Sequence, residues 1–170
     1  MSGNDDSITI GFDPGTALLG YGIVRGERDP VALDYGVVET VAADPMPVRL
    51  LQIYEGVTAV LARYQPATVT VEQLFFARNV TTAIAVGQAR GVVLLAAAQR
   101  GIPVVEYTPA EVKQAVSGYG KADKFQMQEM VRIILNLPAP PQPDDAADAL
   151  AVALCHAHTL QFRRAAADAS

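Results

Sequence analysis

The chain has 170 residues, 51% of them hydrophobic, which predicts one compact domain over residues 1–170. Its 13 Lys and Arg against 18 Asp and Glu give a net charge of −5, which on its own argues against nucleic acid as a ligand. Bound divalent cations would offset that charge locally, so the overall balance does not decide the matter. The first residues form no signal sequence, the apolar runs fall short of a membrane span, and Cys155 is the single cysteine. A cytoplasmic protein without a membrane segment is therefore expected.

The first half of the chain predicts strands followed by a helix. Alternating apolar residues favour strands over 7–13, 19–25 and 31–40, joined as an antiparallel meander. Apolar residues at helical spacing then predict a helix over 48–64. A short apolar strand over 68–72 follows it.

The second half predicts helices with one more strand between them. Asn79 is placed to cap a long helix that ends near Arg100, before Gly101. Thr108 is placed to cap a later helix, with Glu111 in a capping box. A strand is expected over 102–107, and further helices over 123–136 and 144–161.

This order of elements predicts an α/β fold with a five-stranded mixed sheet and helices on its faces. The small, polar ends of the chain, about 1–7 and 162–170, are expected to be disordered. Within the long helix, Gly87 and Gly91 lie on one face among several alanines. That face fits close packing against the chain's own helices and a subunit interface equally well.

Two acidic residues end predicted strands. Asp13 closes the first strand and precedes the tight turn at Pro14 and Gly15, where it is a candidate metal ligand. An aspartate at this point can also do no more than close the turn through its own side chain. Glu72 ends a later apolar strand in the same way.

Two further acids lie three residues apart at the start of the last helix. Asp145 and Asp148 therefore occupy adjacent positions on one helix face. Acids in a first helical turn are favourable without any function, and Asp144 is expected to cap this helix. Asp148 lies beyond the cap in an alanine- and leucine-rich segment, where an unpaired carboxylate would be costly to bury.

Four carboxylates at two strand ends and one helix start suit a site for hard cations with oxygen ligands. Two Mg²⁺ or Mn²⁺ ions about 4 Å apart can activate a water molecule and stabilise the leaving oxygen of a phosphodiester. Such chemistry requires no side-chain nucleophile. His156 and His158 are expected to pack or to face solvent.

Four segments carry a resemblance over nearly the whole chain: GFDPGTALLGYGIV, VEQLFFARNVTTAIAVGQARG, YTPAEVKQAV with GYGKADKFQMQEMV, and DDAADALAVALCHAH. In this order and at this spacing they resemble the motifs of the RuvC-type Holliday junction resolvases, which are bacterial endonucleases with an RNase H-like fold. The resemblance implies cleavage of four-way DNA junctions in homologous recombination and DNA repair by symmetric paired nicks.

The resemblance also implies particular site residues. The acidic metal ligands of the family fall on the four acids singled out above: Asp13, Glu72, Asp145 and Asp148. Its DNA-contacting lysines fall on Lys113 and Lys124, with Lys121 nearby, although the local pattern also suits ordinary solvated charges. Its aromatic residue near the junction point falls on Phe75, which from the local sequence alone is a core residue.

One departure from the family pattern concerns the third ligand. The loop PQPDDAAD is one residue longer than in some relatives, so Asp144 competes with Asp145, and the D-x-x-D spacing favours Asp145. Asp123 also lies among the lysines of GYGKADKF and tempers their positive field. The resemblance further implies a homodimer, since paired incision of a two-fold substrate needs paired sites, and a branch-migration motor of the RuvA and RuvB type as partner.

Other functions fit parts of the pattern. An actin-like ATPase or sugar kinase also begins with an acidic glycine turn, but 170 residues provide no second lobe to enclose a nucleotide. A YqgF-type or RNA:DNA hybrid nuclease would share the fold, whereas the lysine block and the motif order favour RuvC. A non-catalytic protein that binds junctions and recruits a nuclease would have little use for four carboxylates that repel phosphate.

Overall fold

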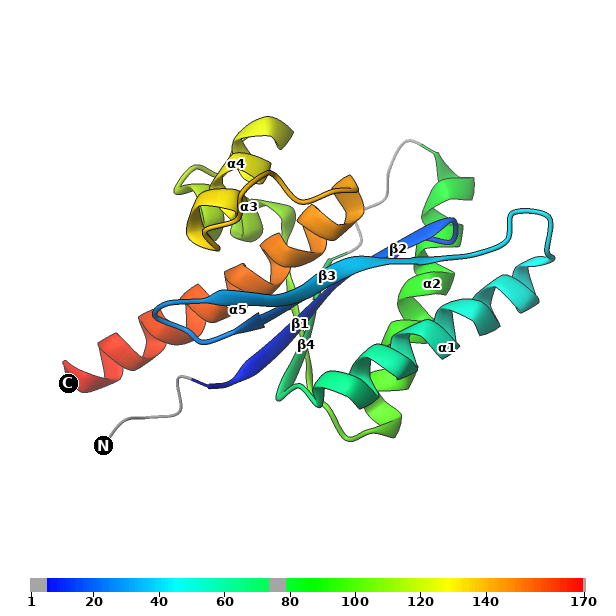
Figure 1. Cartoon of the computed structure of the whole chain (residues 1–170), viewed down its shortest axis with the longest axis horizontal. Helices are drawn as coiled ribbons and strands as arrows, with labels where there is room; N and C mark the ends of the chain where they lie inside the picture. The colour runs from blue at the N-terminus through cyan, green and yellow to red at the C-terminus, as the bar shows by residue number, and fades with distance from the viewer. Residues whose placement is uncertain (1–5, 74–78, 170) are drawn as a thin grey trace.

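The computed structural model describes residues 6–73 and 79–169 and arranges them as one sheet with helices on both faces (Figure 1). Within these residues the sheet has five strands in the order β3–β2–β1–β4–β5. β1, β2 and β3 pair in antiparallel fashion, whereas β4 pairs in parallel with β1 and β5 in parallel with β4. The predicted mixed sheet and meander are confirmed. The strands are β1 (Ile8–Asp13), β2 (Leu18–Arg25), β3 (Val31–Glu39), β4 (Thr68–Glu72) and β5 (Val104–Tyr107).

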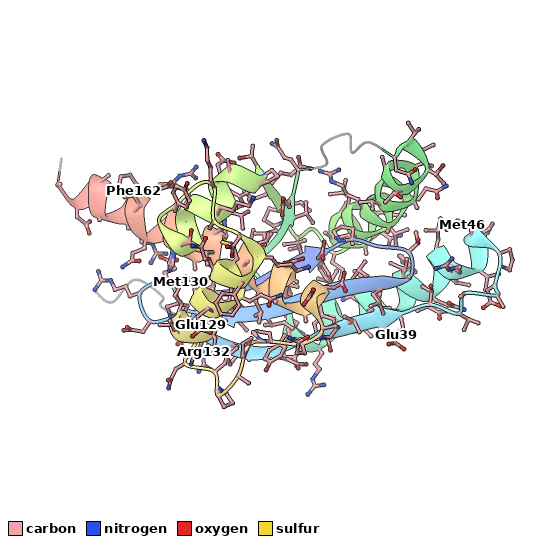
Figure 2. All side chains as sticks on the ribbon, turned by 90° about the horizontal axis from the view of Figure 1, so that it is seen from above. Glu39, Met46, Glu129, Met130, Arg132 and Phe162 are labelled. Carbon is pink, nitrogen blue, oxygen red and sulfur yellow. The ribbon has the colours of Figure 1, made fainter. Side chains whose placement is uncertain are left out.

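Helices of different length cover the two faces of the sheet. α1 (Met46–Tyr64) and α2 (Val80–Gln99) lie on one face, and the long α5 (Asp144–Asp168) crosses the other (Figure 1). The shorter α3 (Pro109–Ser117) and α4 (Lys124–Ile134) pack beside α5, as the view from above shows (Figure 2). Each face therefore has its own hydrophobic core.

The strands present different side chains to the two faces. Ile10 and Phe12 of β1 are fully buried in the core beneath α1 and α2. Alternate positions carry glycine, and a Cβ atom added at Gly11 would lie 2.0 Å from the backbone oxygen of Ala149 in α5. A Cβ atom at Gly20 would lie equally close to the backbone oxygen of Asp145. The glycines thus allow α5 to approach the sheet more closely than any side chain would permit.

Two predicted helix starts are confirmed. The side chain of Asn79 accepts hydrogen bonds from the backbone N–H groups of Thr81 and Thr82 at the start of α2. Thr108 and Glu111 form the expected capping box at the start of α3. Both caps satisfy backbone donors that have no partner inside the helix.

The two ends of α5 differ from expectation. Its N-cap is Pro143 and no side chain caps the helix, so the predicted capping role of Asp144 is wrong. The helix continues to Asp168, past residue 162, from which disorder is expected on the sequence. Alanine is the strongest helix former, and Arg164 forms a 3.0 Å ion pair with the buried Glu27, which ties this end of α5 to the turn after β2.

α2 has the composition of a possible membrane span. Among the described helices it alone is long and apolar enough to cross a membrane, with a mean hydropathy of 1.5 over its most apolar window. The sequence contains no unbroken apolar run long enough to span a membrane, but α2 reaches the required length and mean hydropathy because its few polar residues are spread among apolar ones. Core helices of soluble proteins have the same composition, and α2 contributes Ala89, Val93, Ala96 and Ala97 to the core it shares with α1.

The cysteine and the histidines have packing roles. Cys155 is buried, and burial raises the pKa of its thiol to about 12, so the thiol is neutral and unreactive at physiological pH. His156 is buried with its Nδ1 atom 2.7 Å from the hydroxyl oxygen of Tyr107. His158 is half-buried, with its Nδ1 atom 2.8 Å from the backbone oxygen of Ala115. These contacts agree with the expectation that neither histidine need be a catalytic base.

Candidate active site

Asp13 and Glu72 lie at the same edge of the sheet. β1 and β4 are parallel, and their register pairs Phe12 with Val71, one residue before each acid. The carboxyl ends of two neighbouring parallel strands therefore bring Asp13 and Glu72 side by side. Both side chains are partly buried there.

The first two turns of α5 bring two more carboxylates to this edge. Gly20 is the partner of Asp13 in the ladder between β1 and β2, and it lies against the backbone of Asp145. The close approach at Gly20 thus places Asp145 next to Asp13, and Asp145 is among the groups that raise the pKa of Asp13. Asp148 lies one turn further along the helix and interacts electrostatically with both Asp13 and Glu72.

The electrostatics of the four acids show how closely they are gathered. Burial raises the pKa of Asp13 to about 8, with further contributions from the charges of Asp148, Asp145 and Glu72. Burial also raises the pKa of Glu72, followed by the charge of Asp148, while Lys113 opposes the shift. Burial again raises the pKa of Asp148, and Lys124 is the main opposing influence. The cation-free protein therefore resists full ionisation of the cluster.

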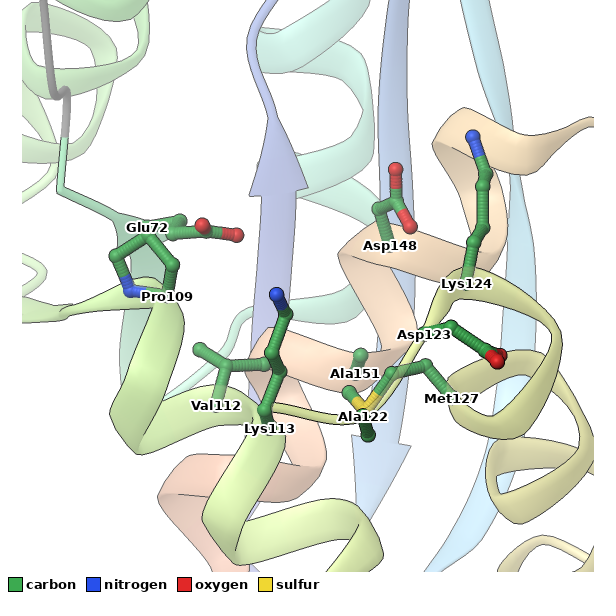
Figure 3. A pocket seen from close by; sticks show the side chains of 10 residues that line it. All are labelled: Glu72, Pro109, Val112, Lys113, Ala122, Asp123, Lys124, Met127, Asp148 and Ala151. Carbon is green, nitrogen blue, oxygen red and sulfur yellow. The ribbon is translucent and has the colours of Figure 1, made fainter. Parts of the chain in front are cut away.

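Two clefts meet at Glu72. The first has a volume of about 250 Å³, and Figure 3 shows its lining, with Glu72 and Lys113 facing Asp148 and Lys124. The second cleft, of about 270 Å³, is lined by Asp13, Glu72, Gln73 and Arg90, among others. Glu72 and Pro109 line both clefts. Asp13, Glu72 and Asp148 therefore line two adjoining clefts, whereas Asp145 is not among the described lining residues of either.

The donor set fits hard divalent cations. Carboxylate oxygens are the ligands preferred by Mg²⁺ and Mn²⁺. Two cations would offset both the burial and the mutual repulsion that raise the pKa of Asp13. Within residues 6–73 and 79–169, no group of three or more His, Cys, Asp or Glu side chains is placed so that it could hold a metal ion. The carboxylates would therefore have to change their side-chain positions to bind one.

The predicted lysines lie at different distances from the acids. Lys113 and Lys124 both line the first cleft, from α3 and α4 respectively. Lys124 forms a 2.8 Å ion pair with Asp144, and this hydrogen bond raises its pKa. Lys121 is exposed on the turn before α4 and does not belong to the described cleft lining. The structure therefore brings Lys113 and Lys124 to the acids and leaves Lys121 at the periphery.

Asp144 and Phe75 have different outcomes. Hydrogen bonds from Lys124 and Gln128 hold the carboxylate of Asp144, lower its pKa and turn it towards α4. This placement favours Asp145 over Asp144 as the third member of the cluster, as the D-x-x-D spacing predicts. Phe75 lies outside the described residues, so its predicted position near the junction is not tested.

Comparisons with known proteins agree with this arrangement. A family model described as "Crossover junction endodeoxyribonuclease RuvC" matches residues 9–156. The crossover junction endodeoxyribonuclease RuvC of Thermomicrobium roseum is 60% identical over 157 residues, covering 92% of this chain and 94% of the relative. That of Chloroflexus aggregans is 61% identical over 151 residues, covering 88% and 92%.

The chain belongs to the RuvC family. Among solved structures, T. thermophilus RuvC in complex with Holliday junction substrate matches with a TM-score of 0.87 and 42% identity, over 92% of this chain and 96% of the other. The yeast mitochondrial Holliday junction resolvase Ydc2 matches with a TM-score of 0.66 at 12% identity, which supports the fold alone. The predicted RNase H-like fold is confirmed.

Arg90 is a cleft residue that the sequence interpretation missed. It projects from α2 into the second cleft, its side chain is 18% exposed, and it pairs with Glu106 of β5. The signal available in the sequence is that Arg90 is the single charged residue in α2. Its pairing with Glu106 depends on how α2 crosses the sheet, which local patterns do not determine.

Proposed function

We propose that this RuvC family member is a Holliday junction resolvase that cuts four-way DNA junctions by symmetric paired nicks in recombination and DNA repair. The observation that carries the proposal is the convergence of Asp13, Glu72, Asp145 and Asp148 beside Lys113 and Lys124. A cluster of acids next to lysine side chains that line a cleft suits a phosphodiester substrate once metal ions are bound. The full-length similarity to crossover junction endodeoxyribonucleases supports the same substrate.

The four carboxylates would hold two Mg²⁺ or Mn²⁺ ions. Two such ions, when bound, activate water and stabilise the leaving oxygen in an in-line displacement. Asp13 and Glu72 would hold their ligand atoms on rigid strand ends, and Asp145 and Asp148 on the first two turns of α5. The partial burial of these acids limits their motion and keeps the ligand geometry defined.

Basic and aromatic residues around the acids would position the DNA. Lys113 and Lys124 flank the cleft, where their ammonium groups can bind backbone phosphates, and Lys121 would extend this contact outward. Phe75 would stack on an unpaired base near the crossover point. These groups orient the scissile phosphate, while the carboxylates and the bound ions perform the chemistry.

A homodimer would supply the second site that paired incision requires. α2 carries an exposed stripe at helical spacing formed by Val80, Ile84, Gly91 and Leu95, with Val80 66% and Ile84 59% exposed. Nothing lies within 4 Å of a Cβ atom added at Gly91, so the chain's own helices do not cover this point. This favours a subunit interface over internal packing and gives the apolar α2 a role other than crossing a membrane.

We further propose a location, a domain organisation and a partner for the protein. The chain would act in the cytoplasm as a single nuclease domain over residues 1–170. Its work would be coupled to a branch-migration motor of the RuvA and RuvB type. The implied location and partner follow from the similarity to bacterial RuvC proteins.

The test compares three labelled substrates: a synthetic four-way junction, a matched linear duplex and an RNA:DNA hybrid. Each is incubated with the purified protein in Mg²⁺, Mn²⁺ or EDTA. Paired nicks that occur only on the junction and only with a divalent ion are expected. Cutting of the hybrid would instead indicate an RNase H-type nuclease, and tight junction binding without cutting would indicate a recruiter.

Asp148→Asn is the sharpest single test of the carboxylate cluster. We expect its junction cleavage to fall by about 100-fold or more, because even the partners of metal ligands contribute about 10- to 100-fold. Junction binding should survive, since the substitution removes a negative charge near the DNA. Glu129→Gln, which neutralises an acid paired with Arg132 on α4, is the matched control and should cleave like the parent. Equal cleavage by Asp148→Asn and the parent would refute the assignment.

A further inference from the structure

The side-chain carboxylate of Asp144 is bound by two side chains of α4. Its Oδ2 atom lies 2.8 Å from the ammonium nitrogen of Lys124, and its Oδ1 atom accepts a 2.9 Å hydrogen bond from the amide of Gln128. Lys124 and Gln128 are four residues apart and therefore one above the other on the same helix face. Asp144 thus ties the first turn of α5 to the first turns of α4.

This contact involves Lys124, whose ammonium group lies beside the first cleft. Lys124 and Asp148 both line the first cleft, and Asp144 is the residue immediately before Asp145. The side chains of Lys124 and Asp144 are 59% and 49% exposed, so water and an incoming ligand can reach the pair. An exposed ion pair of this kind contributes little free energy and is readily exchanged.

We propose that Asp144 is a positioning residue that occupies the phosphate-binding end of Lys124 in the DNA-free protein and gives it up to a backbone phosphate of the junction. The inference rests on the proposed function, since it requires Lys124 to contact DNA. A carboxylate and a phosphate offer the same kind of anionic oxygen to an ammonium group, so one can replace the other.

The exchange has two consequences for the site. DNA must displace the Asp144 carboxylate, so the pair lowers the apparent affinity of any substrate that reaches Lys124. Substrates that do not bring a phosphate to Lys124 leave the ion pair intact, so their affinity is not lowered by it. Asp144 also keeps the lysine extended beside the cleft before DNA arrives, which reduces the side-chain ordering required on binding.

The test is a double-mutant cycle on junction binding, made in the Asp148→Asn protein with Mg²⁺ so that cleavage does not interfere. Asp144→Asn removes the charge and keeps an oxygen for Gln128. We expect it to tighten junction binding about two- to fivefold at low salt, the range of an exposed ion pair, and less as added salt screens the pair. In the Lys124→Ala background the same substitution should change nothing. Lys124→Ala alone should weaken binding and flatten its salt dependence.

Glu129→Gln is the matched control, because it also removes one negative charge beside α4 but from a carboxylate paired with Arg132. It should leave binding within about 1.5-fold of the parent, as expected for a surface charge away from the DNA contact. A thermal unfolding curve of each variant separates a loss of α4 docking from a change in DNA affinity.

Three outcomes would overturn the inference. Unchanged binding by Asp144→Asn would show that the carboxylate does not compete with DNA. Equal tightening with and without Lys124 would assign the effect to net charge. Unchanged binding by Lys124→Ala would remove the premise, while junction cleavage by the parent protein would still uphold the proposed function. A parent that neither binds nor cuts four-way junctions would refute the proposed function itself.

Discussion

The two faces of the sheet are built on different packing principles. Beneath α1 and α2 the buried strand residues are bulky, with Ile10, Phe12 and Leu19 among the largest fully buried side chains. Beneath α5 the alternate strand positions are Gly11 and Gly20, and the helix presses against them with its backbone. The first face resembles an ordinary core, in which side chains fill the space between elements.

The difference indicates which face fixes the site. On the α1–α2 face, flexible side chains lie between helix and sheet, so a small volume change can be absorbed. On the α5 face, backbone touches backbone, and the position of Asp145 relative to Asp13 follows directly from the contact at Gly20. A displacement of α5 on this face therefore moves the carboxylates of Asp145 and Asp148 by the same amount.

Gly20→Ala tests this contrast and should have the largest effect. The added Cβ atom would lie 2.0 Å from the backbone oxygen of Asp145, so the start of α5 must move outward. A shift of about 1 Å at a catalytic group can reduce the rate by about 100-fold, and overpacking costs about 1–3 kcal/mol of unfolding free energy. Junction cleavage at saturating Mg²⁺ and thermal unfolding would measure the two effects.

The matched control removes a methyl group on the opposite face. Ile10→Val should cost about 0.5–1.5 kcal/mol of stability and leave cleavage by the remaining folded protein near the parent rate. If Ile10→Val reduces cleavage as strongly as Gly20→Ala at equal folded fraction, the two faces do not differ in how they position the site.

Asp13→Asn examines the cost of gathering four acids on the glycine-lined face. In the cation-free parent, the pKa of Asp13 is raised to about 8, so the native state keeps a proton that the unfolded chain releases above about pH 4. Stability therefore falls as pH rises from about 4 to 8. Asp13→Asn should remove this loss and be more stable than the parent in EDTA at pH 8, by on the order of 1–3 kcal/mol.

Saturating Mg²⁺ should reverse the order of the two proteins. Cation binding stabilises the parent through the carboxylates, and Asp13→Asn loses one ligand together with cleavage. Thermal unfolding between pH 5 and 8, with EDTA and with Mg²⁺, measures both effects. A variant that is less stable than the parent in EDTA at pH 8 would contradict the repulsion within the cluster.

Local patterns in the sequence predicted most of the fold but only part of the site. Strand alternation, helix periodicity and the caps at Asn79 and Thr108 are confirmed. They could be predicted because each depends on residues that are close in the sequence. The convergence of the carboxylates was expected from strand ends and from the D-x-x-D spacing. The orientation of Asp144 was not, because it depends on Lys124 and Gln128 of another helix. The pairing of Arg90 with Glu106 escaped prediction for the same reason.

A smaller effect is expected from the buried polar pair that lies on the α5 face. The hydroxyl of Tyr107 and the Nδ1 atom of His156 are 2.7 Å apart, whereas the core beneath α1 and α2 is formed by aliphatic side chains, alanines and Phe12. Tyr107→Phe removes the hydroxyl and leaves this ring nitrogen without its partner. The expected cost is about 1 kcal/mol of stability at pH 7.5. His156 lies two helical turns beyond Asp148, but Tyr107 is paired with Glu72 in the ladder between β4 and β5, so junction cleavage is compared at equal folded fraction and should change far less than in Gly20→Ala.

The dependence of protein stability on pH distinguishes the effect of burying His156 from the effect of its hydrogen bond with Tyr107. Burial is the main cause that lowers the pKa of His156, followed by the charge of Arg163. A lowered native pKa means that the unfolded chain takes up the proton first, so stability is lost as pH falls below about 6.5. Tyr107→Phe should keep this acid slope, because the histidine stays buried, whereas His156→Gln should lose it. If His156→Gln keeps the full slope in thermal unfolding between pH 5 and 7.5, a group other than His156 causes it. That group is not one of the carboxylates with a raised pKa, because their protonation stabilises the folded protein as pH falls.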